Sequence, residues 1–377
     1  MYKAIKYRLY PNKEQRELFA KTFGCCRKIW NLMLADKIEH YEKTKESLYV
    51  LTSSYKKDYP YLKEVDANAL DYEKLFLEQA YKNFFRDKRV GFPKFKSAKE
   101  RKSYTTKNSI NKIKGKVYVT IDIKENSIKL PKMGYVKAKI HRAPDEDWKL
   151  KHATISQESD GKYYVAVVFE YEQKVKSVSN PSKVLGLDYK SDGLYMDSEG
   201  NIGNNHKYYR EAQKKLAKEQ RKLSRMKGSK KGETKSNNYL KQLKKVNKIH
   251  RHIANQRLDN LHKISTEIAN QYDVVCVENL DMKAMANKGF HNGKATMDNG
   301  YGIFLNLLEY KLADRGKYFI KVDKWYPSSQ LCSNCGNKKK LTLLDRVYKC
   351  DCGVNIDRDL NAAINIKNEG LKLLSVA

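Results

Sequence analysis

The sequence predicts a multidomain α+β protein. Its 377 residues exceed what one hydrophobic core usually supports, so two or three domains are expected. Apolar residues follow a helical spacing from about residue 14 to 86 and a two-residue spacing from 115 to 172. Hydrophobic residues make up 40% of the chain, and its 27 tyrosines and 11 phenylalanines can fill several cores. The chain is therefore expected to fold rather than to stay disordered.

The first half of the chain is expected to combine a sheet with long helices. Residues 2–10 alternate apolar and polar side chains as a strand does, and a helix is predicted to start near Glu14, after Pro11 interrupts the strand. Residues 87–108 mix cations with aromatic rings, which suits contacts to nucleic acid, although a solvated basic loop is the alternative. The segments within 115–172 predict an antiparallel sheet or small barrel.

The second half is expected to alternate short strands with helices. A polar segment with a proline, residues 174–183, is interpreted as a linker. Lys and Arg number 17 within residues 206–251, against 3 acidic residues, and the spacing predicts two long helices with cationic faces. Short strands are predicted within 184–202 and at 273–278 and 317–323, with a helix at about 303–315.

Charge gives the strongest indication of a partner. Lys and Arg number 76 against 44 Asp and Glu, a formal net charge of +32. Because such an excess destabilises a compact chain through self-repulsion, a polyanion is its usual explanation, and nucleic acid is the expected partner. A solubilising surface is the alternative. The cations predicted to contact phosphate are Lys214, Lys215, Lys218, Arg221 and Lys222.

The sequence favours a reduced, cytoplasmic location without a membrane partner. The N-terminus has no apolar run of signal-peptide length, and no stretch approaches the roughly 20 apolar residues that a membrane span needs. Four of the seven cysteines cluster at 332–352, while Cys25, Cys26 and Cys276 lie elsewhere. This distribution indicates one metal site rather than a disulfide framework.

The clustered cysteines form two close pairs, Cys332 with Cys335 and Cys350 with Cys352. A glycine follows each pair and allows a tight turn, so that both thiolates can face one ion. Four thiolates in this pattern predict a closed, structural zinc site that takes no part in chemistry. Four buried free thiols are the alternative, and the one-residue spacing of the second pair departs from the common two-residue spacing.

Three acids stand at the ends of predicted elements. Asp188 ends the strand VLGLD, Glu278 ends DVVCVE, and Asp359 opens the helix LNAAINI. Converging carboxylates are suitable Mg²⁺ ligands, and two such ions can drive displacement at phosphorus. Two of these acids also have a structural interpretation: Asp359 could be a helix cap, and Glu278 could lie in a surface turn. Asp357 competes with Asp359 for any metal role.

The ordered motifs GLDYKSDGLYMDSEG, VVCVENLDM, WYPSSQLCSNCG, KCDCG and DRDLNAAINI resemble the TnpB family over nearly the whole chain. These proteins are transposon-encoded, RNA-guided DNA endonucleases related to type V CRISPR effectors. The resemblance implies catalytic roles for Asp188, Glu278 and Asp359, with Mg²⁺ as the catalytic ion. It also implies a wedge β-barrel (1–12 and 106–178), an inserted helical recognition domain (13–105), an RNase-H-like (RuvC) nuclease domain (179–327 and 356–377) and an inserted zinc ribbon (328–355).

The function implied by this resemblance is RNA-guided DNA cleavage beside a short flanking motif. The expected partners are a non-coding guide RNA and double-stranded target DNA, with one protein chain in the complex. An RNA-independent nuclease or transposase, and a repressor that binds without cutting, are the alternatives. The glycine-rich segment 287–302 is predicted to be a lid. Further contacts to nucleic acid are predicted for Gln79, Asn83, Lys94, Lys96, Thr105, Thr106 and Asn108.

Overall fold

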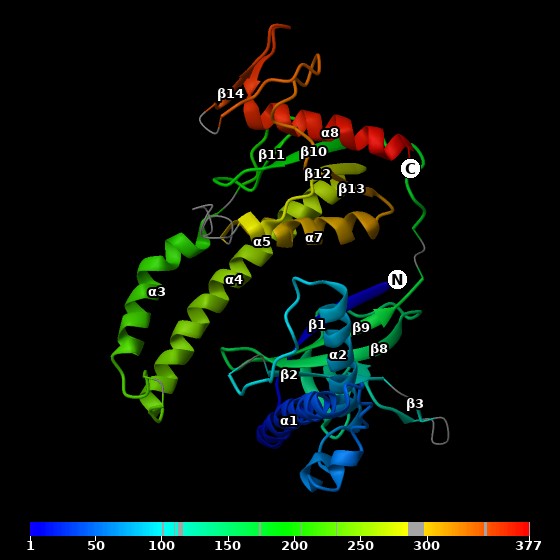
Figure 1. The fold of residues 1–377 in the computed structure, drawn as a ribbon, viewed down its shortest axis with the longest axis vertical. Helices are drawn as coiled ribbons and strands as arrows, with labels where there is room; N and C mark the ends of the chain where they lie inside the picture. Colours follow the sequence, from blue (N-terminus) through cyan, green and yellow to red (C-terminus); the bar gives the residue numbers. More distant parts are fainter. Residues whose placement is uncertain are drawn as a thin grey trace. The chain divides into compact units, whose positions relative to one another are not determined.

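The computed structural model describes two compact units, residues 1–172 and 173–377 (Figure 1). The division falls beside the polar segment that is interpreted as a linker. None of the helices in the described part of the chain combines the length and apolar character that a membrane crossing requires. The described residues are 1–99, 102–108, 110–111, 116–172, 175–204, 206–230, 232–285, 298–342 and 345–376.

The first unit is built on a seven-stranded antiparallel sheet in the order β2-β8-β9-β1-β7-β6-β5. β1 (Tyr2–Leu9) runs through its middle, and alternate residues of this strand, Ile5, Tyr7 and Leu9, are buried. The described strands leave β2 and β5 as open edges. The other strands are β2 (Lys102–Lys107), β3 (Ile110–Asn111), β4 (Lys116–Val117), β5 (Thr120–Asp122), β6 (Ser127–Leu130), β7 (Gly134–Lys139), β8 (Lys149–Gln157) and β9 (Tyr163–Glu170), of which β3 and β4 pair only with each other.

Two long helices pack together beside this sheet, α1 (Lys13–Thr44) and α2 (Ala67–Arg86), joined by the short turns η1 (Ser54–Lys56) and η2 (Pro60–Lys63). Asn12 and Gln15 form a reciprocal capping box, which confirms the predicted start of α1 within one residue. On its buried face, Phe19 stacks with Tyr163 of β9 at 5.4 Å between ring centroids. The predicted domain boundary between residues 105 and 106 is wrong, because it divides β2, which belongs to the sheet.

The second unit contains a four-stranded sheet in the order β11-β10-β12-β13. Its three parallel strands are β10 (Val184–Tyr189), β12 (Val274–Glu278) and β13 (Tyr318–Val322), and β11 (Tyr195–Asp197) joins the edge antiparallel. The strands predicted from VLGLD, DVVCVE and KYFIKVD are thus confirmed. Parallel strands are usually covered on both faces, which explains their nearly continuous apolar sequences.

Helices cover the two faces of this sheet (Figure 1). α8 (Arg358–Val376) lies on one face, while α4 (Asn237–Gln271) and α7 (Tyr301–Ala313) pack on the other. Residues alternate between these faces: Cys276 belongs to the α8 side, whereas Val275 and Val277 belong to the α4 and α7 side. The remaining elements are α3 (Tyr208–Ser224), α5 (Met282–Met285) and the hairpin β14 (Val347–Lys349) and β15 (Asn355–Asp357).

α4 serves two parts of the unit along its 35 residues. Its first half pairs with α3, where the buried Gln242 amide donates to the Glu219 carbonyl at 3.0 Å and carboxylate at 2.7 Å. Its second half contributes Leu261 and Ile268 to the core beneath the sheet. The two long basic helices predicted for residues 206–251 are confirmed as this α3–α4 pair, which extends from the sheet in Figure 1.

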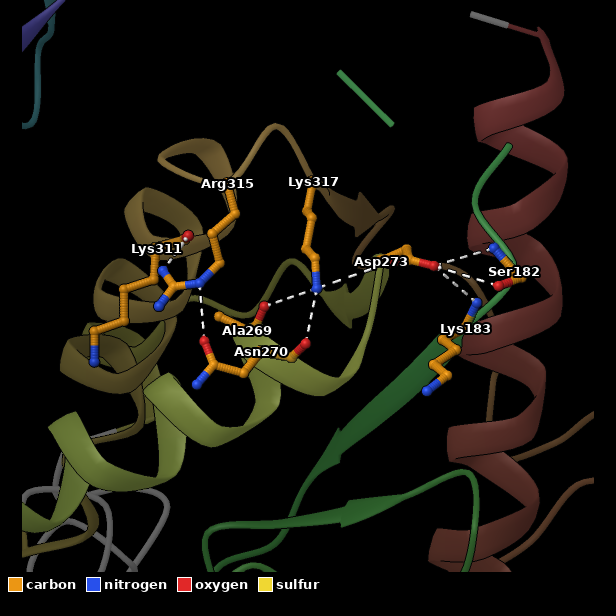
Figure 2. Close-up of polar contacts among 8 residues, drawn as sticks. All are labelled: Ser182, Lys183, Ala269, Asn270, Asp273, Lys311, Arg315 and Lys317. Atoms are coloured by element: carbon orange, nitrogen blue, oxygen red, sulfur yellow. Dashed lines mark hydrogen bonds and ion pairs between the residues drawn. The ribbon is translucent and has the colours of Figure 1, made fainter. Parts of the chain in front are cut away.

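The starting edge of the parallel strands is held by a polar cluster around Asp273 (Figure 2). The Asp273 carboxylate accepts hydrogen bonds at 3.2 Å from the backbone N–H groups of Ser182 and Lys183, just before β10. Lys317, just before β13, lies 3.7 Å from the same carboxylate and donates to the last carbonyl groups of α4. This cluster fixes the starts of all three strands. Their opposite, carboxyl ends take no part in it and can carry functional residues.

Candidate active site

The carboxyl ends of the parallel strands bring Asp188 and Glu278 together. Leu187 pairs with Val277 in register, so the next residues, Asp188 and Glu278, lie side by side on neighbouring strands. Both follow residues that face α4 and α7, and therefore both point to the α8 face. The sequence prediction that these two acids meet at one sheet edge agrees with this register.

Close packing of α8 brings Asp359 to the same edge. A Cβ atom added at Gly186 of β10 would lie 2.1 Å from the carbonyl oxygen of Ala363, and one added at Gly370 of α8 would lie 2.2 Å from the Cys276 sulfur. Both glycines therefore permit a helix-to-sheet distance that a larger residue would prevent. Asp359 lies in the first turn of α8, and its charge and that of Glu278 both act on Asp188.

Burial and mutual repulsion destabilise the charged forms of these carboxylates. The pKa of Asp188 is raised well above its usual value, first by burial and then by the charges of Asp359 and Glu278. Burial raises the pKa of Glu278 to about 7. A nearby cation stabilises the charged form of buried carboxylates such as these. The arrangement is typical of functional sites.

Two cations compensate Asp359. Lys190 Nζ lies 2.6 Å from one Asp359 oxygen, and the Arg358 guanidinium lies 3.3 Å from the other. Burial alone would raise the pKa of Asp359, but the hydrogen bond and charge of Lys190, together with Arg358, lower it overall. Asn299 holds the Lys190 loop by donating to the carbonyl groups of Lys190 and Gly193 at 3.0 and 2.6 Å.

Asp357 has a different position from Asp359. Its Oδ1 accepts hydrogen bonds from the backbone N–H groups of Asp359 at 2.8 Å and Leu360 at 3.1 Å. The side chain is exposed and caps the first turn of α8. This geometry favours the helix-capping interpretation of Asp357 and leaves Asp359 to face the other two acids.

The four cysteines form the tightest group of potential metal ligands among the described residues. The Sγ atoms of Cys332, Cys335, Cys350 and Cys352 all lie within 4.8 Å of one another. Sγ–Sγ distances of 3.5 and 3.6 Å join Cys332 to Cys352 and Cys335 to Cys350, close to the edge of about 3.8 Å expected for a tetrahedron with 2.3 Å Zn–S bonds. The short Cys350–Cys352 spacing therefore does not prevent convergence.

The turns that place these thiols have the expected backbone. Gly336 and Gly353 adopt positive φ angles of 75° and 94°, which glycine alone adopts at little cost. The sequence prediction of a tight turn after each cysteine pair is confirmed. By contrast, the three acids do not form a group within the same 4.8 Å limit in the described part of the chain, and Asp359 is paired with Lys190 instead.

The cysteine segment is attached directly to α8. Asn361 accepts a hydrogen bond from the Ser333 N–H at 2.9 Å and donates to the Leu331 carbonyl at 2.6 Å. Asn365 donates to the carbonyl groups of Ser328 and Leu331 at 2.8 and 2.7 Å. Both asparagine side chains are buried, so these contacts fix the segment before the first cysteine pair onto the helix that carries Asp359.

Three parts of the chain match described sequence families. Residues 301–366 match "Cas12f1-like, TNB domain", residues 166–289 match "Probable transposase", and residues 1–46 match "Helix-turn-helix domain". In this structure residues 1–46 form one strand and one long helix rather than two helices joined by a turn.

Curated relatives match almost the whole chain. A Streptomyces pristinaespiralis protein named "Putative RNA-guided DNA endonuclease" is 31% identical over 98% of this chain and 89% of its own length. The Escherichia coli K12 protein "Putative RNA-guided DNA endonuclease InsQ" is 28% identical over 99% and 93%. "TnpB-like protein L79" of Acanthamoeba polyphaga mimivirus is 33% identical over 37% of this chain and 28% of its own length. The chain belongs to the TnpB family. A solved structure titled "Cryo-EM structure of the Cas12f1-sgRNA-target DNA complex" aligns over 98% of the chain and 99% of its own, with 14% identity and a TM-score of 0.48.

The cations of α3 lie on an open face of this TnpB-family chain. Lys214, Lys215, Lys218 and Arg221 are exposed, as expected for residues that contact a polyanion. Lys222 is also exposed but lies 3.0 Å from Glu219 one turn earlier, so part of its charge is already compensated. Leu216 lies between these cations in the sequence and is buried, on the helix that packs against α4.

Three polar residues predicted to contact nucleic acid are instead used inside the TnpB fold. Thr106 is fully buried, and its hydroxyl donates to Asp66. Thr105 is buried and shares a hydrogen bond with Thr154 at 2.9 Å. The Asn108 amide donates to the Leu150 carbonyl and accepts from the Val119 N–H. These polar groups are satisfied within the first unit, so the structure gives no support to the prediction that they read base edges.

The remaining predicted contacts of the first unit differ in accessibility. Lys96 is half-buried, forms an ion pair with the buried Glu73 and lies 4.0 Å from the Trp30 ring centroid, so its charge is already compensated within the unit. Lys94 is exposed. Gln79 and Asn83 do share one face of α2, as predicted, and their side chains hydrogen-bond at 3.0 Å. A cleft near α2 and β2 is lined by Arg27, Lys96 and Lys102, among others.

Two residues near the acids were missed by sequence reasoning. Lys190 lies two residues after Asp188, and only its contact with Asp359, 169 positions away, reveals its place. Tyr301 is buried, and its hydroxyl has no hydrogen-bond partner among the described residues. Its pKa is raised first by burial and then by the charges of Asp188 and Glu278, which places it near both acids. Most of the predicted lid, residues 287–297, lies outside the described part of the chain.

Proposed function

We propose that this TnpB-family chain is an RNA-guided DNA endonuclease of transposon origin, with Asp188, Glu278 and Asp359 as its catalytic carboxylates. Relatives with this activity in their names match nearly the full chain. The observation that best supports the residue assignment is the close packing of α8 on the sheet, which directs acids from three distant segments to one edge. Because these acids repel one another, binding of a cation between them is favourable.

Mg²⁺ fits this set of donors. Carboxylate oxygens are its preferred protein ligands, and a divalent cation would offset both the burial and the repulsion that raise the pKa of Asp188. Asp188, Glu278 and Asp359 would hold one or two such ions, and bound Mg²⁺ would supply a polarised phosphate and an activated water. Lys190 and Arg358, which now compensate Asp359, are also placed to attract the phosphate charge of a DNA strand.

A structural zinc ion fits the cysteine cluster. The four thiols already have the separations of a tetrahedral site, and four thiolates leave no open coordination position for chemistry. The ion would stabilise residues 328–355, which Asn361 and Asn365 attach to α8. We therefore propose that zinc stabilises the segment that supports the catalytic helix and the strand being cut.

The proposed partners are a non-coding guide RNA and double-stranded target DNA, bound by a single protein chain in the cytoplasm. The exposed cations of α3 suit backbone phosphates, and the guide would supply sequence recognition by base pairing. In the first unit, Lys94, Gln79 and Asn83 are the predicted contacts that stay available. The domain plan is kept as wedge sheet, helical insertion, RuvC-like domain and ribbon, with the helical insertion ending before residue 102.

Replacing Asp188 with Ala tests the catalytic assignment. Binding of RNA and target DNA should persist, because the change removes one anion from a protein that binds polyanions. Cleavage of a target plasmid should fall by several orders of magnitude if metal-assisted catalysis is lost. Asp359→Ala should behave alike, whereas Asp357→Ala, the matched control, should retain most activity because its part is helix capping.

Two results would contradict this site. One is near-wild-type cleavage by Asp188→Ala, and the other is an inactive Asp357→Ala beside an active Asp359→Ala. RNA guidance is tested separately by sequencing the RNA that co-purifies with the full chain. A single discrete non-coding RNA supports guidance, whereas random fragments support an RNA-independent nuclease. Retained DNA binding without any Mg²⁺-dependent cleavage by wild-type protein would support the repressor alternative.

A further inference from the structure

Trp325 is the most exposed large hydrophobic residue of the described chain, with 80% of its surface accessible. The other two tryptophans differ: Trp30 is buried, and Trp148 is half-buried and stacks on Tyr171. Burial of an indole ring is strongly favourable, so an indole this exposed to solvent is expected to be covered by a binding partner. The question is which partner suits its surroundings.

The position of Trp325 is fixed by the register of the sheet. Val322, the last residue of β13, pairs with Glu278 on the neighbouring strand. Trp325 follows three residues later, so its Cα lies at most about 16 Å from that of Glu278, given the spacing of strands and the length of an extended chain. It therefore belongs to the edge where the proposed catalytic acids meet.

The loop that carries Trp325 is short and well held. Asp323 accepts the Trp325 N–H on its side chain at 2.8 Å and the Tyr326 N–H on its carbonyl at 3.0 Å. Tyr326 turns inward and packs on the core formed by Val322 and Ile366. Asn365 then holds the Ser328 carbonyl at 2.8 Å. A ring on such a loop loses little conformational freedom when something binds to it.

The charges around Trp325 suit a polyanion. Lys324 Nζ lies 4.8 Å from the centroid of the indole ring. The cysteine segment that follows, residues 332–352, contains five Lys or Arg and two Asp. An aromatic face among cations is the usual platform for bases of a single strand, because every base has a flat face and the cations contact the backbone. A base inside a duplex has both faces covered by its neighbours, so an unpaired strand suits the ring better.

We propose that Trp325 stacks on a base of the unpaired DNA strand beside the carboxylate edge, and so positions that strand for cutting. The proposal rests on the proposed nuclease function and adds a binding residue to it. Trp325 is a positioning residue here, since it touches the strand and not the reacting phosphate. Lys324 would contact the neighbouring backbone.

The test measures binding of a short single-stranded DNA that carries one 2-aminopurine, whose fluorescence is quenched on stacking. The full chain with its co-purified RNA is used without added Mg²⁺, so that no cleavage is needed. Trp325→Ala should weaken binding about 10-fold, the effect of one lost base–aromatic contact, and should abolish the quenching that this ring causes. Trp325→Phe should retain most of both. Leu371→Ala, an apolar truncation at the far end of α8, is the control and should change neither.

Because Trp325 is exposed, its replacement should leave the thermal midpoint unchanged, so that any effect reports binding. Unchanged single-strand affinity and quenching in Trp325→Ala would overturn the proposal and leave a protein partner as the use of the ring. Equal losses on single-stranded and duplex probes would also overturn it. The catalytic assignment is judged separately by Asp188→Ala cleavage, so either idea can fail alone.

Discussion

The Asn361 side chain donates a 2.6 Å hydrogen bond to the backbone carbonyl of Leu331. Leu331 immediately precedes the first cysteine of the metal-binding cluster, and Asn361 lies two residues after Asp359 in the same helical turn. Asn361 also accepts the Ser333 N–H, so one buried amide holds the chain on both sides of Cys332. The Asn361 side chain therefore joins the cysteine cluster to the proposed catalytic helix.

Replacing Asn361 with Ala should weaken the attachment of the cysteine cluster to the proposed catalytic helix. The Ser333 N–H would lose its partner, which typically costs about 1–3 kcal/mol for a buried group left unsatisfied, while the Leu331 carbonyl would keep only its hydrogen bond from Asn365. We expect a lower thermal midpoint and reduced cleavage, with zinc retained because no thiol is removed. Asn355→Ala, on the exposed surface of β15, is the matched control. An Asn361→Ala protein with wild-type stability and activity would refute this coupling.

Cys335→Ser should release the proposed zinc ion. Serine lacks the thiolate that completes the four-sulfur site, and structural zinc contributes directly to folding. Elemental analysis should find about one zinc per wild-type chain and much less in the variant. Cys276→Ser, at a buried thiol outside the cluster, should keep its zinc. Folded wild-type protein without zinc would disprove the assignment.

The exposed α3 lysines should bind RNA through ionic contacts. Changing Lys214, Lys215 and Lys218 together to Ala should weaken RNA binding and lower the slope of log affinity against log salt by about 2, since each lost phosphate contact retains its counterions. Titrations at several salt concentrations measure both quantities. Lys372→Ala, at the exposed end of α8, should leave the slope unchanged. An unchanged slope in the triple variant would mean that these lysines only face solvent.

The buried Lys311 should give the fold a characteristic pH dependence. Its ammonium donates to the His262 carbonyl and the Ser265 and Thr266 hydroxyls, at 2.7 to 2.8 Å, and forms no ion pair with a carboxylate of the described residues. Burial lowers its pKa to about 8, and the charge of Arg315 acts in the same direction. Between that value and about 10.4, the unfolded chain holds a proton that the folded chain has released, so stability contributed by this site rises with pH.

The variant Lys311→Met removes this titration. The two hydroxyls keep partners, because each also donates to a helix carbonyl. Wild-type protein should therefore gain stability relative to Lys311→Met when the urea midpoint is measured at pH 10 rather than pH 7. Lys263→Met, at an exposed lysine, is the control and should lack this relative change. Parallel pH curves for wild type and Lys311→Met would contradict the prediction.

Local sequence patterns predicted the features that depend on neighbouring residues. Strand ends at Asp188 and Glu278 and the turn glycines after each cysteine pair follow from short-range rules. Contacts between distant residues were not accessible in this way. Thr106 and Lys96 are surface residues by type. Only their tertiary partners Asp66, the cap of α2, and Glu73, on α2, explain the burial of Thr106 and the ion pair of Lys96. The pairing of Lys190 with Asp359 similarly requires the tertiary fold.

The continuous course of α4 restricts how this molecule can change length during evolution. One helix carries both the contact to α3 through Gln242 and the core contacts of Leu261 and Ile268. Inserting or deleting a single residue between them would rotate the basic α3–α4 pair by about 100° around the helix axis relative to the sheet. A change of seven residues restores the facing to within about 20°. Length variation among natural or engineered forms should therefore occur in the 225–236 loop, or in α4 only by whole heptads.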